Sequence, residues 1–176
     1  MLNREQQLDS VIKQATPEQI NNGVIWYQEA HAFCKELSKE FGVEFKKVCA
    51  ICAALSPLKS WSINKRITRD YLTGKRDLHT KLQINKCDWI MRGDKIEKCL
   101  GGLKTINFYK NILYPKDNNW VTIDRHMLTV FNENYSLAPK KYDQLKQACI
   151  NYSKETLWVS PEVQAIAWCV VRGKAD

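Results

Sequence analysis

The 176-residue chain is poor in residues that interrupt regular structure, with 7 glycines and 5 prolines. No apolar run reaches the ~18–20 residues that a membrane-spanning helix needs, so we expect no membrane segment. No Asn-Gly or Asp-Gly turn lies between alternating apolar segments, which argues against β-hairpins. The polar first residues carry no signal-peptide core. With 44% apolar and 26% charged residues, the composition is that of a globular domain able to bury its own core.

Disulfides and metal ligands are not indicated either. Seven cysteines, an odd number spread along the chain, fit a reducing compartment better than a disulfide framework. Cys49 and Cys52 form a C-x-x-C pair, but they lie in the apolar run 48–55 and are expected to be small core residues. A zinc site would need two more ligands at recognisable spacing, and an iron–sulfur centre would need a four-cysteine cluster. We therefore predict no metal and no cofactor.

Helix signals recur along the chain instead. Thr16-Pro17-Glu18 is typical of a helix start, and Phe41-Gly42 of its end. Ser60 is a candidate N-cap, and the stretch 75–100 suggests short helices interrupted at Gly93-Asp94. Further helices are predicted over the apolar run to Leu55, Ser60 to Thr73, Leu103 to Leu113, from near Thr122, Pro139 to Tyr152, and from a cap at Ser160 to Arg172. The prediction is one all-α domain over residues 1–176.

Charge is distributed unevenly. Residues 58–110 contain 13 lysines and arginines against 5 acidic residues, whereas the two flanks cancel, so this segment accounts for the net charge of +8. A local basic block predicts a polyanionic partner, nucleic acid first, and the alternative is a solvated surface. The expected phosphate contacts on one polar helix face are Lys59, Lys65, Arg66 and Arg69.

Three segments, in order, resemble a known family. Residues 53–65 hold a buried apolar stretch, a Leu-Ser-Pro turn and an Ile-Asn-Lys segment. Residues 102–107 read Gly-Leu-Lys-Thr-Ile-Asn, and residues 121–130 read Val-Thr-Ile-Asp-Arg-His-Met-Leu-Thr-Val. They resemble the L-S-x-Q, G-x-G-x-K-T-A and V-D-T-H-x-x-R-V motifs of the helix-hairpin-helix DNA glycosylase superfamily, the endonuclease III group. The pattern is also similar to short phage-encoded relatives, some proposed to act on hypermodified thymine.

Two alignments of the middle stay open. The expected glutamine and the first hairpin glycine are missing, so residues 102–107 are either the hairpin itself or part of the helix preceding a lost hairpin. Both alignments place Asp124 at the catalytic aspartate. The resemblance thus implies a reduced glycosylase fold in which Asp124 is the catalytic carboxylate.

The chemistry of glycosidic cleavage suits that assignment. The reaction passes through an oxocarbenium-like sugar, and a carboxylate beside C1′ can stabilise its charge or activate water. An Asp at a helix N-terminus is also favoured by the helix dipole alone. His126 is a candidate for proton transfer, or else a packed residue. Arg125, which flanks Asp124, is a candidate DNA contact.

The remaining candidates each have two interpretations. Lys104 is either a nucleophile that forms a Schiff base, which would make a glycosylase/lyase, or a phosphate contact. Gly101 and Gly102 either expose backbone N–H groups to a phosphate or form a helix C-cap. Trp61 either inserts into a base stack or belongs to the core. Three further residues are expected to line a cleft between terminal and central helices: Tyr109, Trp168 and Arg172.

We therefore predict a monomeric, cytoplasmic DNA glycosylase-like enzyme, of a bacterial host if phage-encoded, that cleaves the bond to a flipped modified or damaged base in duplex DNA. Two alternatives stay open. One is a base- or nucleotide-modifying enzyme on the same scaffold, in a hypermodified thymine pathway. The other is a DNA-binding module without catalysis.

Overall fold

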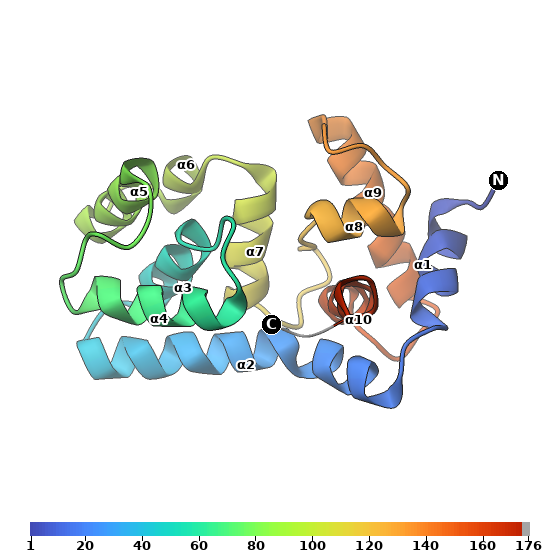
Figure 1. Ribbon diagram of the computed structural model, residues 1–176, viewed down its shortest axis with the longest axis horizontal. Coiled ribbons are helices and arrows are strands. Elements are labelled where there is room, and N and C mark those ends of the chain that lie inside the picture. Colours follow the sequence, from blue (N-terminus) through green and yellow to red (C-terminus); the bar gives the residue numbers. More distant parts are fainter. Residues whose placement is uncertain (174–176) are drawn as a thin grey trace. The chain divides into compact units, whose positions relative to one another are not determined.

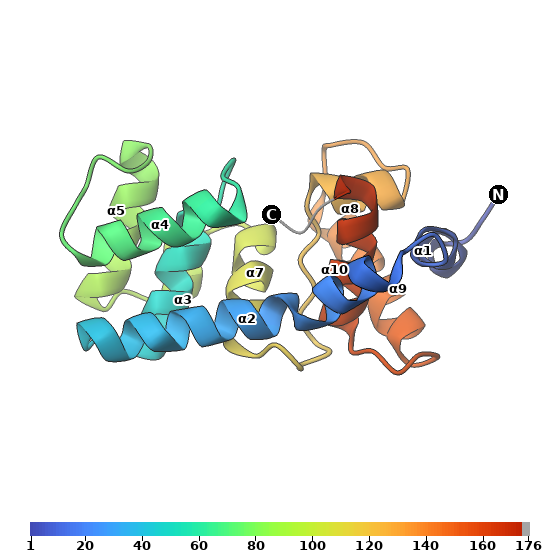
Figure 2. The same cartoon turned by 60° about the horizontal axis from the view of Figure 1, so that its bottom comes forward.

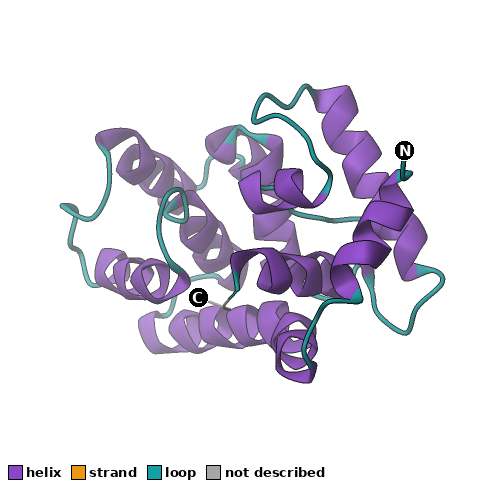
Figure 3. Cartoon of the chain, turned by 45° about the vertical axis from the view of Figure 1, so that its right-hand side comes forward, coloured by secondary structure: helices purple, strands orange, loops and turns teal. Residues whose placement is uncertain are grey.

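A computed structural model describes residues 1–173, and over them the chain is helical with no strand (Figures 1 and 3). This confirms the predicted all-α fold class. The helices are α1 (Arg4–Ile12), α2 (Pro17–Phe41), α3 (Phe45–Ala54), α4 (Trp61–Leu72), α5 (Lys81–Arg92), α6 (Ile96–Leu100), α7 (Leu103–Leu113), α8 (Arg125–Val130), α9 (Pro139–Ser153) and α10 (Ser160–Arg172). None of the described helices is both long enough and apolar enough to cross a membrane.

Contacts divide the chain into two compact units. Among the described residues, the terminal unit consists of residues 1–29 and 114–173, and the central unit consists of residues 30–113. Helix α2 contributes its first half to the terminal unit and its second half to the central unit.

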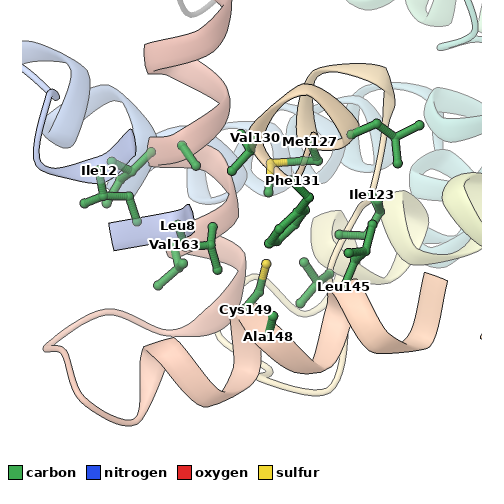
Figure 4. Close-up of a cluster of buried hydrophobic side chains, with 14 of the residues drawn as sticks. Leu8, Ile12, Ile123, Met127, Val130, Phe131, Leu145, Ala148, Cys149 and Val163 are labelled. Atoms are coloured by element: carbon green, nitrogen blue, oxygen red, sulfur yellow. The ribbon is translucent and has the colours of Figure 1, made fainter. Parts of the chain in front are cut away.

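The terminal unit is built around α10, which packs against α1, α8 and α9. Its core includes Leu8 of α1, Phe131 just after α8, and Leu145 and Cys149 of α9, all fully buried (Figure 4). Residues 160–167 of α10 are buried in succession, so this helix is covered on every side over its first two turns. Such a helix forms the centre of a helical unit rather than its surface.

The central unit is built around α3, which packs against α4, α5, α6 and α7 (Figures 1 and 2). Every residue from Val48 to Leu55 is inaccessible to solvent. Cys49 and Cys52 are therefore core residues as predicted, and both are free thiols.

Helix boundaries follow the local capping signals. Thr16 Oγ1 accepts a hydrogen bond from the backbone N–H of Gln19 (3.2 Å), and Ser60 Oγ accepts from Ile63 N–H (3.4 Å), as expected at the starts of α2 and α4. Helix α1 was not predicted, although Asn3 and Gln6 form a reciprocal capping box at its start. Such a pair is a sequence-level signal for a helix N-terminus.

One predicted helix start and one predicted N-cap are wrong. Helix α8 begins at Arg125 rather than near Thr122, because Asp124 is its N-cap. Ser160 does not cap α10, since the N-cap is Val159 and the Ser160 hydroxyl donates to the Asn118 carbonyl (2.8 Å).

Candidate active site

The segment leading into Asp124 is buried and held by one tyrosine. Val121, Thr122 and Ile123 are at most 6% exposed. The Tyr142 hydroxyl donates to the Val121 carbonyl (2.9 Å) and accepts from the Ile123 N–H (3.1 Å), so it supplies the partners that a helix or sheet would otherwise provide. Burial raises the pKa of the Tyr142 phenol well above its ordinary value, which keeps the donor protonated. Tyr142 therefore fixes the backbone that presents Asp124.

Replacing Tyr142 with phenylalanine is expected to lower the free energy of unfolding by about 2 kcal/mol, because a buried N–H and a buried carbonyl lose their partner. The measurement is urea unfolding of the variant and the wild type. Tyr135→Phe, at a side chain that is 80% exposed, is the control and should stay within about 0.5 kcal/mol of the wild type. Equal stability of Tyr142→Phe and the wild type would contradict this role.

The Asp124 carboxylate accepts three hydrogen bonds. Oδ1 accepts from the backbone N–H groups of His126 and Met127, each at 3.0 Å, which caps α8. Oδ2 accepts from the indole Nε1–H of Trp168 at 3.1 Å. The side chain is half-buried. A carboxylate offers about four acceptor positions, two on each oxygen. Donors of the described residues occupy both positions of Oδ1 and one of Oδ2, so one acceptor position on Oδ2 remains.

Trp168, which contacts this carboxylate, packs against two further rings. The Trp168 indole meets the His126 ring edge-to-face at 6.0 Å and the Trp26 indole at 6.1 Å between centroids. The Arg172 guanidinium lies 4.8 Å from the centroid of the Trp168 ring, within cation–π range. Asp124, His126, Trp168 and Arg172, which the sequence singled out separately, therefore meet at one place in the terminal unit. Sequence reasoning did not single out Trp26.

A buried polar pair supports the aromatic cluster. The Tyr27 hydroxyl donates to Gln164 Oε1 at 2.6 Å, and both residues are buried. Burial raises the pKa of Tyr27 well above its ordinary value, so the phenol remains a donor. Gln164 and Trp168 lie one turn apart on α10, opposite the consecutive residues Tyr27 and Trp26 of α2. The sequence carries no local signal for Gln164, because a glutamine in a helix is ordinarily solvated.

The other candidates lie elsewhere. Arg125 is exposed on the first turn of α8. Tyr109 belongs to the central unit, where it is 3% exposed. Lys104 also belongs to the central unit and is exposed on the first turn of α7. A lysine nucleophile is activated by desolvation or by a neighbouring cation. The exposed amine of Lys104 is not desolvated.

The two glycines join α6 to α7. Gly101 ends α6 as its C-cap with φ +82°, and Gly102 precedes the first residue of α7. Both are exposed, and a Cβ added to either would meet no atom within 4 Å. A short helix, a two-glycine turn and a second helix therefore follow one another over residues 96–113. The C-cap interpretation holds for Gly101, because the N–H groups of Gly101 and Gly102 donate to the carbonyls of Glu97 and Leu100, each at 3.1 Å.

Helix α4 places its basic residues in two environments. Lys65 Nζ lies 5.7 Å from the centroid of the Trp61 ring, and Arg66 is exposed. Trp61 is half-buried and meets the Phe33 ring edge-to-face at 5.9 Å, so it is a packed residue. Arg69 instead pairs with Glu40 (2.6 Å) and Glu36 (3.7 Å) of α2. Arg69 therefore differs from Lys65 and Arg66 in having carboxylates at ion-pair distance.

An exposed leucine was not predicted. Leu58, in the loop between α3 and α4, is 93% exposed and has φ +59°, a conformation that disfavours branched or bulky side chains. His79 Nε2 lies 3.0 Å from the carbonyl oxygen of the preceding Pro57, which anchors the loop. Lys59 follows directly. Hydropathy assigns such a leucine to the core, so only the backbone geometry reveals its exposure.

The charge separates by unit. Residues 30–113 contain 17 lysines and arginines against 8 acidic residues, while the described part of the terminal unit contains 9 against 10. Within the basic segment, five side chains pair with carboxylates and Lys86 donates to the Leu100 carbonyl (3.1 Å). The remaining seven also have no carboxylate at ion-pair distance among the described residues: Lys59, Lys65, Arg66, Lys81, Lys95, Lys98 and Lys104.

The fold and site thus define an all-helical protein with a half-buried carboxylate held by a tryptophan in one unit and a basic second unit. Among the described residues, no group of three or more His, Cys, Asp or Glu side chains is placed to hold a metal ion. The chain belongs to a family of unknown function, DUF7178, whose model matches residues 3–175. No curated protein matches it, and no solved structure matches it.

Proposed function

We propose that this protein is a DNA glycosylase that uses Asp124 as its catalytic carboxylate. The observation that carries the proposal is the Asp124 carboxylate itself, which is oriented by three donors, one of them the indole of Trp168 in an aromatic cluster. Glycosidic cleavage requires a positioned carboxylate and a site for an extruded base, and aromatic side chains are the usual stacking partners of such a base.

The proposed step is hydrolysis. The C1′–N bond breaks, its electron pair leaves with the base, and water forms the new bond to C1′. Asp124 stabilises the positive charge on the sugar and accepts the proton of the water, while the leaving base takes up a proton from solvent or from His126. We favour hydrolysis over the lyase route because Lys104 is exposed and offers no desolvated amine.

DNA is proposed to bind through the central unit. The basic side chains of Lys59, Lys65, Arg66 and Lys104, which have no carboxylate at ion-pair distance among the described residues, would contact phosphates. Leu58 is an exposed apolar side chain that directly precedes Lys59 in the sequence. Apolar side chains of this kind insert between base steps in proteins that distort DNA. Arg125 would add a phosphate contact near the carboxylate.

The test is incubation of the protein with duplexes that each carry one uracil, oxidised, alkylated or hypermodified base, followed by detection of abasic sites. We expect one class of base to be released. Mass spectrometry of the same reactions detects an altered base that stays on the strand, the result expected of a modifying enzyme. Binding without any change to any base would instead identify a DNA-binding module, and absence of binding would overturn the proposal.

The charge arrangement makes a separate prediction about affinity. The double variant Lys65→Gln/Arg66→Gln is expected to bind duplex DNA about ten-fold or more weakly at low salt and to reduce the slope of log K against log salt by about 2, because each phosphate contact contributes about 0.9 to that slope. Arg69→Gln is the matched control on the same helix. Its guanidinium already pairs with Glu36 and Glu40, so the slope should barely change. Equal losses in both variants would contradict the assignment.

A further inference from the structure

Trp168 is placed differently from the residues before it on α10. Residues 160–167 are buried in the core of the terminal unit, whereas Trp168 is half-buried and directs its indole N–H to Asp124 Oδ2. An indole is a donor only. It can therefore hydrogen-bond the carboxylate without competing for the proton that the reaction moves.

Its neighbours restrict the indole. Arg172 lies over the ring at 4.8 Å, and the Trp26 and His126 rings approach it edge-to-face at about 6 Å. Trp26 comes from α2 and His126 from α8, so contacts from three helices determine where the ring lies. A tryptophan has only two side-chain torsions, which makes it a rigid holder for another side chain.

We propose that Trp168 is a positioning residue for Asp124, an inference that rests on the proposed function. The backbone N–H groups of His126 and Met127 hold Oδ1, and the Trp168 indole holds Oδ2. With both oxygens held, the carboxylate has no freedom to rotate about its Cβ–Cγ bond. The remaining acceptor position on Oδ2 then has a defined direction for water or the sugar.

The first test is kinetic. Trp168→Phe keeps an aromatic face for Arg172, Trp26 and His126 but removes the N–H. Single-turnover base release is expected to slow by roughly 10- to 100-fold, the range for a lost hydrogen bond to a charged group, while the Kd for DNA stays within two-fold. Trp158→Phe is the matched control, because Trp158 packs on the same core cluster. In an Asp124→Asn background, Trp168→Phe should have little further effect. An unchanged rate, or equal losses for both tryptophans, would overturn the proposal.

The second test needs no activity. In a ¹H–¹⁵N spectrum, the indole signal that disappears in Trp168→Phe belongs to Trp168. Asp124→Asn should change the chemical shift of that signal by much more than it changes the shifts of the other five indole signals. The reason is that the amide places a donor where Oδ2 accepts. An unmoved signal would overturn the positioning role even if bases are released. If the signal moves but the protein releases no base, the contact between Trp168 and Asp124 is confirmed and the proposed glycosylase function is rejected.

Discussion

Asp124→Asn is expected to slow base release on the order of 10³-fold, within the range attributed to a positioned acid–base group. The substitution removes the negative charge and the proton acceptor but keeps a side chain that caps helices as well as aspartate does. The amide oxygen can still accept from His126 and Met127 N–H. The measurement is single-turnover release from the duplex that the wild type cleaves, with circular dichroism to show that helix content is unchanged.

Two further variants separate chemistry from folding. Asp143→Asn, on an exposed position of α9, should retain the wild-type rate. Asp124→Ala should lose activity to the same extent as Asp124→Asn and also about 1 kcal/mol of stability, because the cap of α8 is lost. If Asp124→Asn released base within a few-fold of the wild-type rate, Asp124 would be a capping residue and nothing more.

Gly23→Ala is expected to lower the free energy of unfolding by about 3 kcal/mol, at the upper end of the usual cost of overpacking. A Cβ at this position would lie 2.6 Å from the backbone nitrogen and Cα of Ile166 on α10. Backbone atoms cannot move aside like a flexible side chain, so the two helices must separate. This cost exceeds the gain of about 1 kcal/mol that alanine brings inside a helix.

The same substitution should reduce base release, because Trp26 and Trp168 occupy the same pair of helices as Gly23 and Ile166. Urea unfolding gives the stability and single-turnover kinetics the rate. Gly102→Ala is the control for stability, since no atom lies within 4 Å of its added Cβ. The midpoint of its unfolding should come at a urea concentration at least as high as that of the wild type. A Gly23→Ala protein as stable as the wild type would show that α2 and α10 do not depend on this contact.

Local capping chemistry predicted much of the helical pattern. Thr16-Pro17 and Ser60 begin α2 and α4 where expected, since a hydroxyl and a fixed proline φ act within one turn of the chain. The start of α8 could not be predicted in this way. Residues 121–123 lie at the predicted start of this helix but are not helical themselves. The backbone groups of Val121 and Ile123 hydrogen-bond to the Tyr142 hydroxyl, which comes from a distant part of the sequence.

The candidate site shows the same division. Asp124, His126, Trp168 and Arg172 could each be singled out by residue type and position. The hydrogen bond between Trp168 and Asp124 spans 44 residues and depends on how α10 packs, which no local pattern encodes. Likewise, Arg69 was selected because it lies in the basic central segment. Its ion pairs with Glu36 and Glu40 depend on the packing of α4 against α2, which the local sequence does not encode.

The division of the chain into two units also constrains the order of its synthesis and folding. Helix α1 packs only against α8, α9 and α10 among the stronger helix contacts of the described residues, and all three are translated after the whole central unit. The central unit is one uninterrupted segment, so its contacts can form while the ribosome is still at work. The terminal unit can form only after its last helices have been made. Its formation joins two segments separated by residues 30–113, and the entropic cost of closing such a loop grows only slowly with loop length. Leu8 and Ile12 therefore remain exposed on the nascent chain until the last helices emerge.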